Sequence, residues 1–216
     1  MGINSYLSGF LAFLLLIVLG CNDASIDNQN EDKESLGDVK CEYTYDSNGV
    51  KNGKYECFYP HGKIWMSGTI KDDSLKVNED LLYYPTGQLK EYRFYNPIGE
   101  ERYRRVYNEK GELTKEEGDF FSHVTISSST FSIRDSAVLS FFVASPPGTM
   151  YRVYGVNSKG RYEMSLEKTD ITYLQKKLLY ADKPGNYVFP YEVEFTDTTT
   201  GVKEVRKDDV SFEVTK

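Results

Sequence analysis

The sequence has few of the residue types on which metal sites and nucleophilic sites depend. Its 216 residues include two histidines, His61 and His123, and three cysteines with no Cys-x-x-Cys pair. This pattern argues against a metal site. Neither histidine lies in a recognisable nucleophile motif, and the chain has no glycine-rich phosphate loop. We therefore expect a protein that is not an enzyme, with no metal, no cofactor and no catalytic residue.

Acidic residues leave a narrower catalytic alternative. Glu192 and Glu194 are two positions apart in a predicted strand, where side chains on one face lie about 7 Å apart, a separation that two catalytic carboxylates can use. No sequence feature indicates a cleft around them. The pairs Asp72-Asp73 and Asp208-Asp209 are typical of solvated turns, because neither lies in a calcium-binding loop motif. A hydrolase with an unrecognised site is therefore the third hypothesis, behind two binding functions.

Charge and long apolar runs are both missing from the first twenty residues. Met1–Gly20 has no charged side chain, and its unbroken apolar run, Phe10–Leu19, is ten residues long. At ~1.5 Å per residue, this run covers about half of a ~30 Å hydrocarbon core. It is too short to span a bilayer, and it is typical of the apolar middle of an export signal.

The residues that follow, Val18-Leu19-Gly20-Cys21, resemble the lipobox of bacterial lipoproteins. The resemblance implies that residues 1–20 are a signal peptide and that Cys21 becomes a diacylated and N-acylated N-terminus. Several acyl chains anchor a protein stably, whereas one chain binds only marginally. We expect a lipid-anchored protein of the bacterial cell envelope, at the outer membrane, on its periplasmic or surface face. The alternative is an uncleaved apolar segment.

The formal net charge of −7 argues against a nucleic-acid partner. Most of this charge is local, because Asn22–Asp38 contains six acidic residues and one lysine, Lys33. The segment has few apolar side chains to bury, so we expect residues 21–38 to form a disordered acidic tether behind the lipidated cysteine.

Cys41 and Cys57 remain as a candidate disulfide, because an exported chain meets an oxidising compartment. Two turn signals lie between them, Asn48-Gly49 and Asn52-Gly53. A hairpin folded about Gly49 places the two cysteines opposite each other, whereas a turn at Asn52-Gly53 does not. The sequence leaves both registers open.

Turn signals recur about every twelve residues in the first half of the chain, at the six positions Gly49, Gly62, Ser74, Gly87, Gly99 and Gly111. Aromatic and aliphatic runs of strand length separate them, which indicates successive β-hairpins. Tyr55–Ile70 aligns with Asp80–Tyr95, twenty-five residues later, and Arg104–Leu113 is a looser third copy in which Tyr107 is matched to Tyr59. We expect an antiparallel meander over residues 39–118.

The stretch Asn48–Tyr55 (NGVKNGKY), followed by Phe58–Ile64 (FYPHGKI), resembles MORN-type repeats, in particular an antitoxin-like variant found in exported bacterial proteins. The resemblance implies an elongated single-layer meander that serves as an interaction platform.

From about residue 119 to residue 216 the pattern changes to short strands separated by Pro/Gly/Asn/Ser turns, which suits an antiparallel immunoglobulin-like β-sandwich. The predicted strands are His123–Ser127, Ala137–Ala144, Met150–Val156, Tyr162–Leu166, Thr172–Tyr180, Tyr187–Phe195 and Val210–Val214. Lys183–Tyr187 (KPGNY) resembles the start of the penultimate strand in bacterial immunoglobulin-like and PKD-like domains, where the tyrosine often makes a corner hydrogen bond. Pro190 requires an edge position or a bulge.

Three aromatic residues of the repeats, Trp65, Tyr92 and Phe94, are the best lead to a ligand, because such residues are enriched at binding hot spots and stack on sugar rings. The alternative is that they close the thin meander onto its neighbour. The first hypothesis is a non-enzymatic binding or scaffold module for an envelope or extracellular protein. The second is a carbohydrate-binding accessory protein. The oligomeric state does not follow from the sequence.

Overall fold

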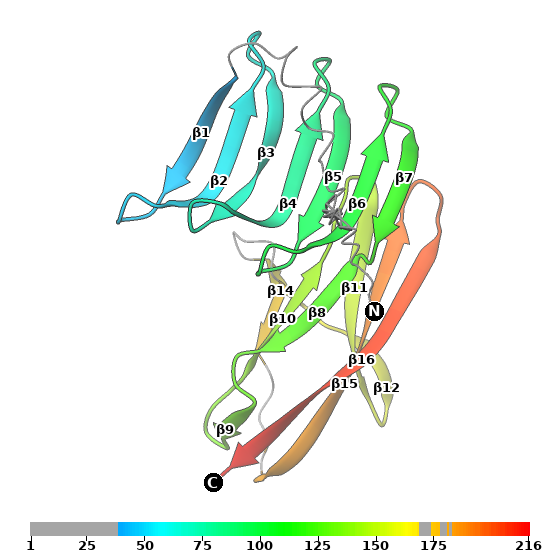
Figure 1. Cartoon of the computed structure of the whole chain (residues 1–216). Helices are drawn as coiled ribbons and strands as arrows, with labels where there is room; N and C mark the ends of the chain where they lie inside the picture. Colours follow the sequence, from blue (N-terminus) through cyan, green and yellow to red (C-terminus); the bar gives the residue numbers. More distant parts are fainter. Residues whose placement is uncertain (1–38, 169–173, 178–180, 182) are drawn as a thin grey trace, which may run out of the picture. The chain divides into compact units, whose positions relative to one another are not determined.

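The computed structural model describes residues 39–168, 174–177, 181 and 183–216, which contain sixteen strands and no helix (Figure 1). The predicted all-β fold class is therefore confirmed. The described residues all lie within one compact unit. The predictions for residues 1–38, including lipidation at Cys21, fall outside the described residues. Within the described residues there is no helix that is long and apolar enough to cross a membrane.

The first half of the described chain forms one seven-stranded antiparallel sheet in which every strand pairs with its neighbours in sequence, as predicted for a meander (Figure 1). Its strands are β1 (Lys40–Tyr45), β2 (Lys51–Phe58), β3 (Ile64–Lys71), β4 (Leu75–Tyr83), β5 (Leu89–Tyr95), β6 (Glu101–Tyr107) and β7 (Leu113–Gly118). All six predicted turn positions fall between these strands.

Five of the six turns share one hydrogen-bond pattern. The amide of the first residue donates to the carbonyl of the fifth, and the amide of a glycine in fourth place donates back to the first carbonyl; the first residues are Asp46, Tyr59, Tyr84, Asn96 and Asn108. The five glycines have φ between 80° and 90°, a conformation that other residues adopt only with strain. The common turn therefore explains the regular glycine spacing.

The repeats are also joined to each other through the turns that follow β2 and β4. The Tyr59 hydroxyl donates to the carbonyl of Tyr83 (2.7 Å), and the Tyr84 hydroxyl donates to the carbonyl of Tyr107 (2.9 Å). The third turn begins at Asn108 rather than at Tyr107. The alignment of Tyr107 with Tyr59 was wrong by one residue, because Tyr107 is the last residue of its strand.

The second half of the described chain forms two further sheets. The four-stranded sheet has the order β13-β14-β10-β8, and the five-stranded sheet has the order β12-β11-β15-β16-β9. The strands are β8 (Phe121–Ile126), β9 (Thr130–Ser132), β10 (Val138–Val143), β11 (Thr149–Asn157), β12 (Gly160–Glu163), β13 (Glu167–Lys168), β14 (Leu174–Lys177), β15 (Gly185–Asp197) and β16 (Lys203–Thr215).

These strands overlap the seven predicted positions, but β9 and β13 were not predicted, and β9 pairs with β16 in parallel. The predicted strand Thr172–Tyr180 lies partly outside the described residues, and β14 occupies the part that is described. The hydroxyl of Tyr187 donates to the carbonyl of Lys183 (2.7 Å), which is the expected corner hydrogen bond. The ladder between β11 and β15 ends at Tyr191, so the adjacent Pro190 lies on an open side of β15, as predicted.

One hydrophobic core joins the two sheets of the second half to the inner strands of the seven-stranded sheet. Leu139, Phe141 and Val193 are fully buried in it, together with Tyr92 and Tyr103 from β5 and β6. The change of sheet falls between Gly118 and Phe121, close to the predicted domain boundary. Strands β1, β2 and β3 contribute no residue to this core.

Candidate binding surface

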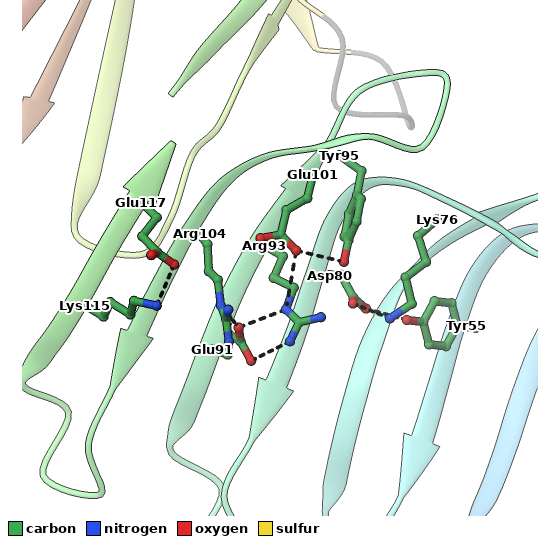
Figure 2. A network of polar contacts seen from close by, with 10 residues as sticks. All are labelled: Tyr55, Lys76, Asp80, Glu91, Arg93, Tyr95, Glu101, Arg104, Lys115 and Glu117. Atoms are coloured by element: carbon green, nitrogen blue, oxygen red, sulfur yellow. Dashed lines mark hydrogen bonds and ion pairs between the residues drawn. The ribbon is translucent and has the colours of Figure 1, made fainter. Parts of the chain in front are cut away.

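The seven-stranded sheet carries a line of polar residues that are cross-strand partners in successive strands (Figure 2). We call it the charged row; its members are Tyr55, Gly68, Asp80, Arg93, Arg104 and Glu117. Cross-strand partners share one face of a sheet, and side chains two residues away point to the same side. Glu91, two residues from Arg93, therefore extends the row, and Lys76 joins it through its ion pair with Asp80.

Two arginines hold Glu91, whose carboxylate is buried. Arg93 donates to it through Nε (2.9 Å) and Nη2 (3.0 Å), and Arg104 donates through Nε from the next strand. Glu101 lies 3.8 Å from Arg93 at the edge of the same cluster. Because charged donors occupy both oxygens of Glu91, its carboxylate is positioned as a structural anion rather than as a general base.

Asp80 is held in a similar way, and a glycine makes the contact possible. The Tyr55 hydroxyl donates to its Oδ1, and the Lys76 ammonium lies 2.7 Å from its Oδ2. Tyr55 reaches Asp80 across β3 at Gly68, where a Cβ atom would stand 2.9 Å from Oδ1 and 3.0 Å from the tyrosine ring. Burial, and then the charge of Asp80, raises the pKa of Tyr55 well above its usual range. The hydroxyl therefore remains a donor.

Strand β4 has a bulge beside Asp80, at Asn78 and Glu79. Asn78 has φ 61° and is buried, and neither polar atom of its side chain has a hydrogen-bond partner. The carboxylate of the next residue, Glu79, accepts from the Tyr92 hydroxyl (3.0 Å), which in turn accepts from the Ser145 amide (2.7 Å). Tyr92 thus joins the seven-stranded sheet to the chain that follows β10.

The aromatic residues predicted to contact a ligand do not form one surface. Tyr92 and Phe94 have 1% and 0% of their surface exposed and belong to the core, where Tyr92 meets Tyr103 edge-on at 6.3 Å. Their expected exposure was wrong, and the packing alternative describes them. Both lie on the face of β5 that packs against the second half of the chain, a fact that requires the tertiary structure. Trp65 in β3 is half-buried, and Tyr45 in β1 is exposed.

Cys41 and Cys57 form a disulfide between β1 and β2, and they are paired in the strand register. The hairpin turns at Asp46–Val50, so the register about Gly49 is the one adopted. Gly53 lies inside β2, where it pairs with Ile70.

The carboxylates and one histidine considered from the sequence are already engaged. Arg161 binds both Glu192 (3.2 Å) and Glu194 (2.8 Å). The His61 ring lies 3.0 Å from the carbonyl of Pro85. Among the described residues, no group of three or more His, Cys, Asp or Glu side chains is arranged to hold a metal ion. Asp72 and Asp73 form the turn after β3, where both have positive φ.

His123 lines a hollow of about 530 Å³ beside the β5–β6 turn. The lining residues are Asn96, Pro97, Ile98, His123, Thr125 and Phe142. The His123 ring stacks on Phe142 at 4.4 Å, and its Nδ1 lies 2.9 Å from the Ser122 hydroxyl. Burial, and then the positive charge of Arg102, lowers the pKa of His123. Burial thus favours the neutral form of the ring, which packs on Phe142 beside the β5–β6 turn.

The sequence arguments missed the charged row because no local motif marks it. Glu91 and Arg93 are two residues apart, but Arg104 joins them only through the register of β5 and β6. The shared turn pattern fixes that register, so the repeat spacing was the one signal that pointed to these partners.

Comparisons of the chain with protein-family models, with curated proteins and with solved structures found no match. The fold class therefore comes from the structure and not from a relative. The chain is an all-β protein in which a seven-stranded antiparallel meander is joined to two further sheets through one core.

Proposed function

We propose that this protein is a lipid-anchored binding module of the bacterial cell envelope, which recognises another protein and catalyses no reaction. The observation that carries the proposal is the position of β1, β2 and β3, which we call the outer strands. They extend the sheet beyond the shared core and yet are regular strands, of which β1 and β2 are joined by a disulfide. Their aromatic side chains include the exposed Tyr45 and the half-buried Trp65. Partly exposed aromatic residues on a rigid support are typical of protein-binding surfaces.

A protein partner is favoured over a carbohydrate because the expected aromatic strip is incomplete. Two of its three residues, Tyr92 and Phe94, are buried, and Trp65 alone remains accessible in part. The resemblance to MORN-type repeats over residues 39–118 supports the same function, since it implies an interaction platform. The engagement of Glu91, Asp80, Glu192 and Glu194 in ion pairs makes each a poor general base.

The binding proposal is tested by photo-crosslinking in the native envelope. A photoreactive phenylalanine analogue replaces Tyr45 in the outer strands or, as a matched control, Val188 in β15, which have 55% and 60% of their surface exposed. We expect a discrete crosslinked protein from position 45 and none from position 188. Equal products from both positions, or none from position 45, would count against recognition by the outer strands. A glycan array with Trp65→Ala as control tests the carbohydrate alternative.

The anchor is tested separately by mass spectrometry of the N-terminal peptide. We expect a peptide that begins at Cys21 and carries the mass of its acyl groups, and we expect Cys21→Ser to leave the membrane fraction. An intact Met1 terminus on the membrane-bound protein is the result that contradicts the anchor.

A further inference from the structure

The chain enters the folded unit at one particular end of the seven-stranded sheet. The first strand residue, Lys40, is paired with Phe58, the last residue of β2, and the turn after β2 follows at Tyr59. The turns after β2, β4 and β6 all lie at this end, which is uppermost in Figure 1. We call it the braced end, because the contacts described next connect its turns.

Successive turns at the braced end are tied together by side chains. From the turn after β2, Tyr59 donates to the carbonyl of Tyr83 (2.7 Å), and Lys63 donates to the carbonyl of Thr86 (2.8 Å). The His61 ring lies 3.0 Å from the carbonyl of Pro85. The next turn repeats the tyrosine contact through Tyr84. In contrast, β1 is an edge strand that, among the described strands, pairs with β2 alone.

An edge strand pulled from its end separates one residue pair at a time, so each pair resists alone. Here the pair Lys40↔Phe58 is followed at once by Cys41↔Cys57, which is covalent. Tension that reaches Cys41 therefore passes to Cys57 through the sulfur atoms and does not load the rest of β1. Cys57 is buried and is paired with both β1 and β3, and two residues further on the chain reaches Tyr59 and its brace.

We propose that the Cys41–Cys57 disulfide and the braced end form an attachment that resists tension and protects the edge strand from peeling when the preceding segment is pulled. The direction of this load rests on the proposed N-terminal anchor. The attachment itself depends only on the register, the disulfide and the turn contacts. It functions when the cysteines are oxidised and is lost when they are reduced.

Single-molecule force spectroscopy on the full chain in detergent tests this proposal. Peptide handles are inserted after Asn30 and added after Lys216, and the same molecules are pulled before and after a reductant is added. The disulfide prevents the loop between the two cysteines, with a sequence separation of 16, from extending under force. Reduction is therefore expected to lengthen the unfolded chain by about 50 Å, and to add an early step at low force in which β1 peels away. The double variant Cys41→Ser/Cys57→Ser should behave like the reduced chain.

A pair of tyrosine variants tests the brace while the disulfide stays intact. Tyr59→Phe removes a hydroxyl that donates to a backbone carbonyl at 2.7 Å, and Tyr187→Phe removes a hydroxyl with the same kind of contact, also at 2.7 Å, far along the chain in β15. We expect a lower first rupture force for Tyr59→Phe alone.

A reduced chain with no early step and an unchanged rupture force would overturn the role of the disulfide in resisting tension. Equal rupture forces for the two tyrosine variants would overturn the brace. Neither result depends on lipidation, which the N-terminal mass reports separately, so failure of the anchor and failure of the attachment remain distinguishable.

Discussion

The outer strands and the two sheets of the second half are stabilised in different ways. In the second half, side chains such as Leu139, Phe141 and Val193 have no exposed surface and contact residues that are distant in sequence. The outer strands contribute no residue to that core and are held by a disulfide, by repeated turns and by the hydrogen bond from Tyr55 to Asp80.

This difference separates local from long-range determinants of the fold. The conformation of a five-residue glycine turn is determined by the residues of the turn itself, and each repeat adds one more hairpin to the sheet. A buried apolar cluster depends on the arrangement of all its strands at once. Destabilising each region in turn should therefore produce changes of different size and different extent.

The largest effect is expected from the core. Phe141→Ala removes a fully buried ring that meets Tyr191 edge-on at 5.3 Å, and it should lower the free energy of unfolding by about 3–5 kcal/mol. Because the core also contains Tyr92 and Tyr103, the loss should reach the seven-stranded sheet. Denaturant unfolding followed by tyrosine fluorescence measures it. Val188→Ala on the exposed side of β15 is the control, with an expected change below about 0.5 kcal/mol.

Loss of the disulfide should have the next largest effect and should stay local. Cys41→Ser/Cys57→Ser removes a crosslink with a sequence separation of 16, for which chain entropy predicts a cost of about 3 kcal/mol. Hydrogen exchange should increase in β1 and β2 much more than in β10. A uniform increase throughout the described strands would show that the outer strands are not a separate cooperative region.

The glycines of the repeated turns provide a matched pair. Gly49 and Gly99 have φ of 80° and 81°, so a substitution by alanine brings similar backbone strain of about 1–2 kcal/mol. At Gly49 an added Cβ meets nothing within 4 Å, whereas at Gly99 it lies 2.3 Å from Leu75 Cδ1. We expect Gly99→Ala to destabilise the protein by about 1 kcal/mol more than Gly49→Ala. Equal midpoints of unfolding for the two variants would show that Leu75 moves aside freely.

These turns also explain which parts of the fold the sequence could predict. The positions of Gly49 through Gly111 predicted the hairpins because a positive φ is a local requirement. The sequence signal was weaker in the third repeat, where Asn108 replaces the tyrosine of the earlier turns and the alignment with Tyr107 shifted by one residue. The three-residue strand β9 was missed because its partner, β16, lies some eighty residues away in sequence.

The candidate site was less predictable than the fold because its contacts join residues that are distant in sequence. Aromatic residues at Tyr92 and Phe94 are compatible with either an exposed or a packed face, and only the position of the second half of the chain decides between them. The buried acids Asp80 and Glu91 each have a partner from another strand, Tyr55 of β2 and Arg104 of β6. Alternation within one strand shows which residues share a face, but it does not show which face is covered.

Loss of a hydrogen bond between the two regions should lower the free energy of unfolding less than the glycine substitutions do. Tyr92→Phe keeps the buried ring but removes the oxygen that accepts from the Ser145 amide at 2.7 Å and donates to Glu79 at 3.0 Å. We expect a loss of about 1 kcal/mol in the free energy of unfolding. Faster hydrogen exchange at the Ser145 amide should accompany it. Unchanged exchange there would mean that another group satisfies this amide.

The smallest expected effect is the pH dependence that arises from His123. Burial, and then the charge of Arg102, lowers the pKa of this imidazole below its ordinary value of 6.5, so the folded state favours the neutral ring. The resulting contribution to stability is complete above pH 6.5 and decreases as the pH falls from there to the folded pKa, because the unfolded chain takes up the proton first. Each unit by which the pKa is lowered corresponds to about 1.4 kcal/mol at most.

His123→Gln isolates this contribution from the titration of carboxylates, which both proteins share. The difference in the free energy of unfolding between the wild type and the variant should become smaller or reverse as the pH is lowered from about 7 to about 5. An NMR titration of the His123 Cε1 proton measures the folded pKa directly. A midpoint at or above 6.5 would mean that the folded protein stabilises the charged imidazolium on Phe142 as well as water does.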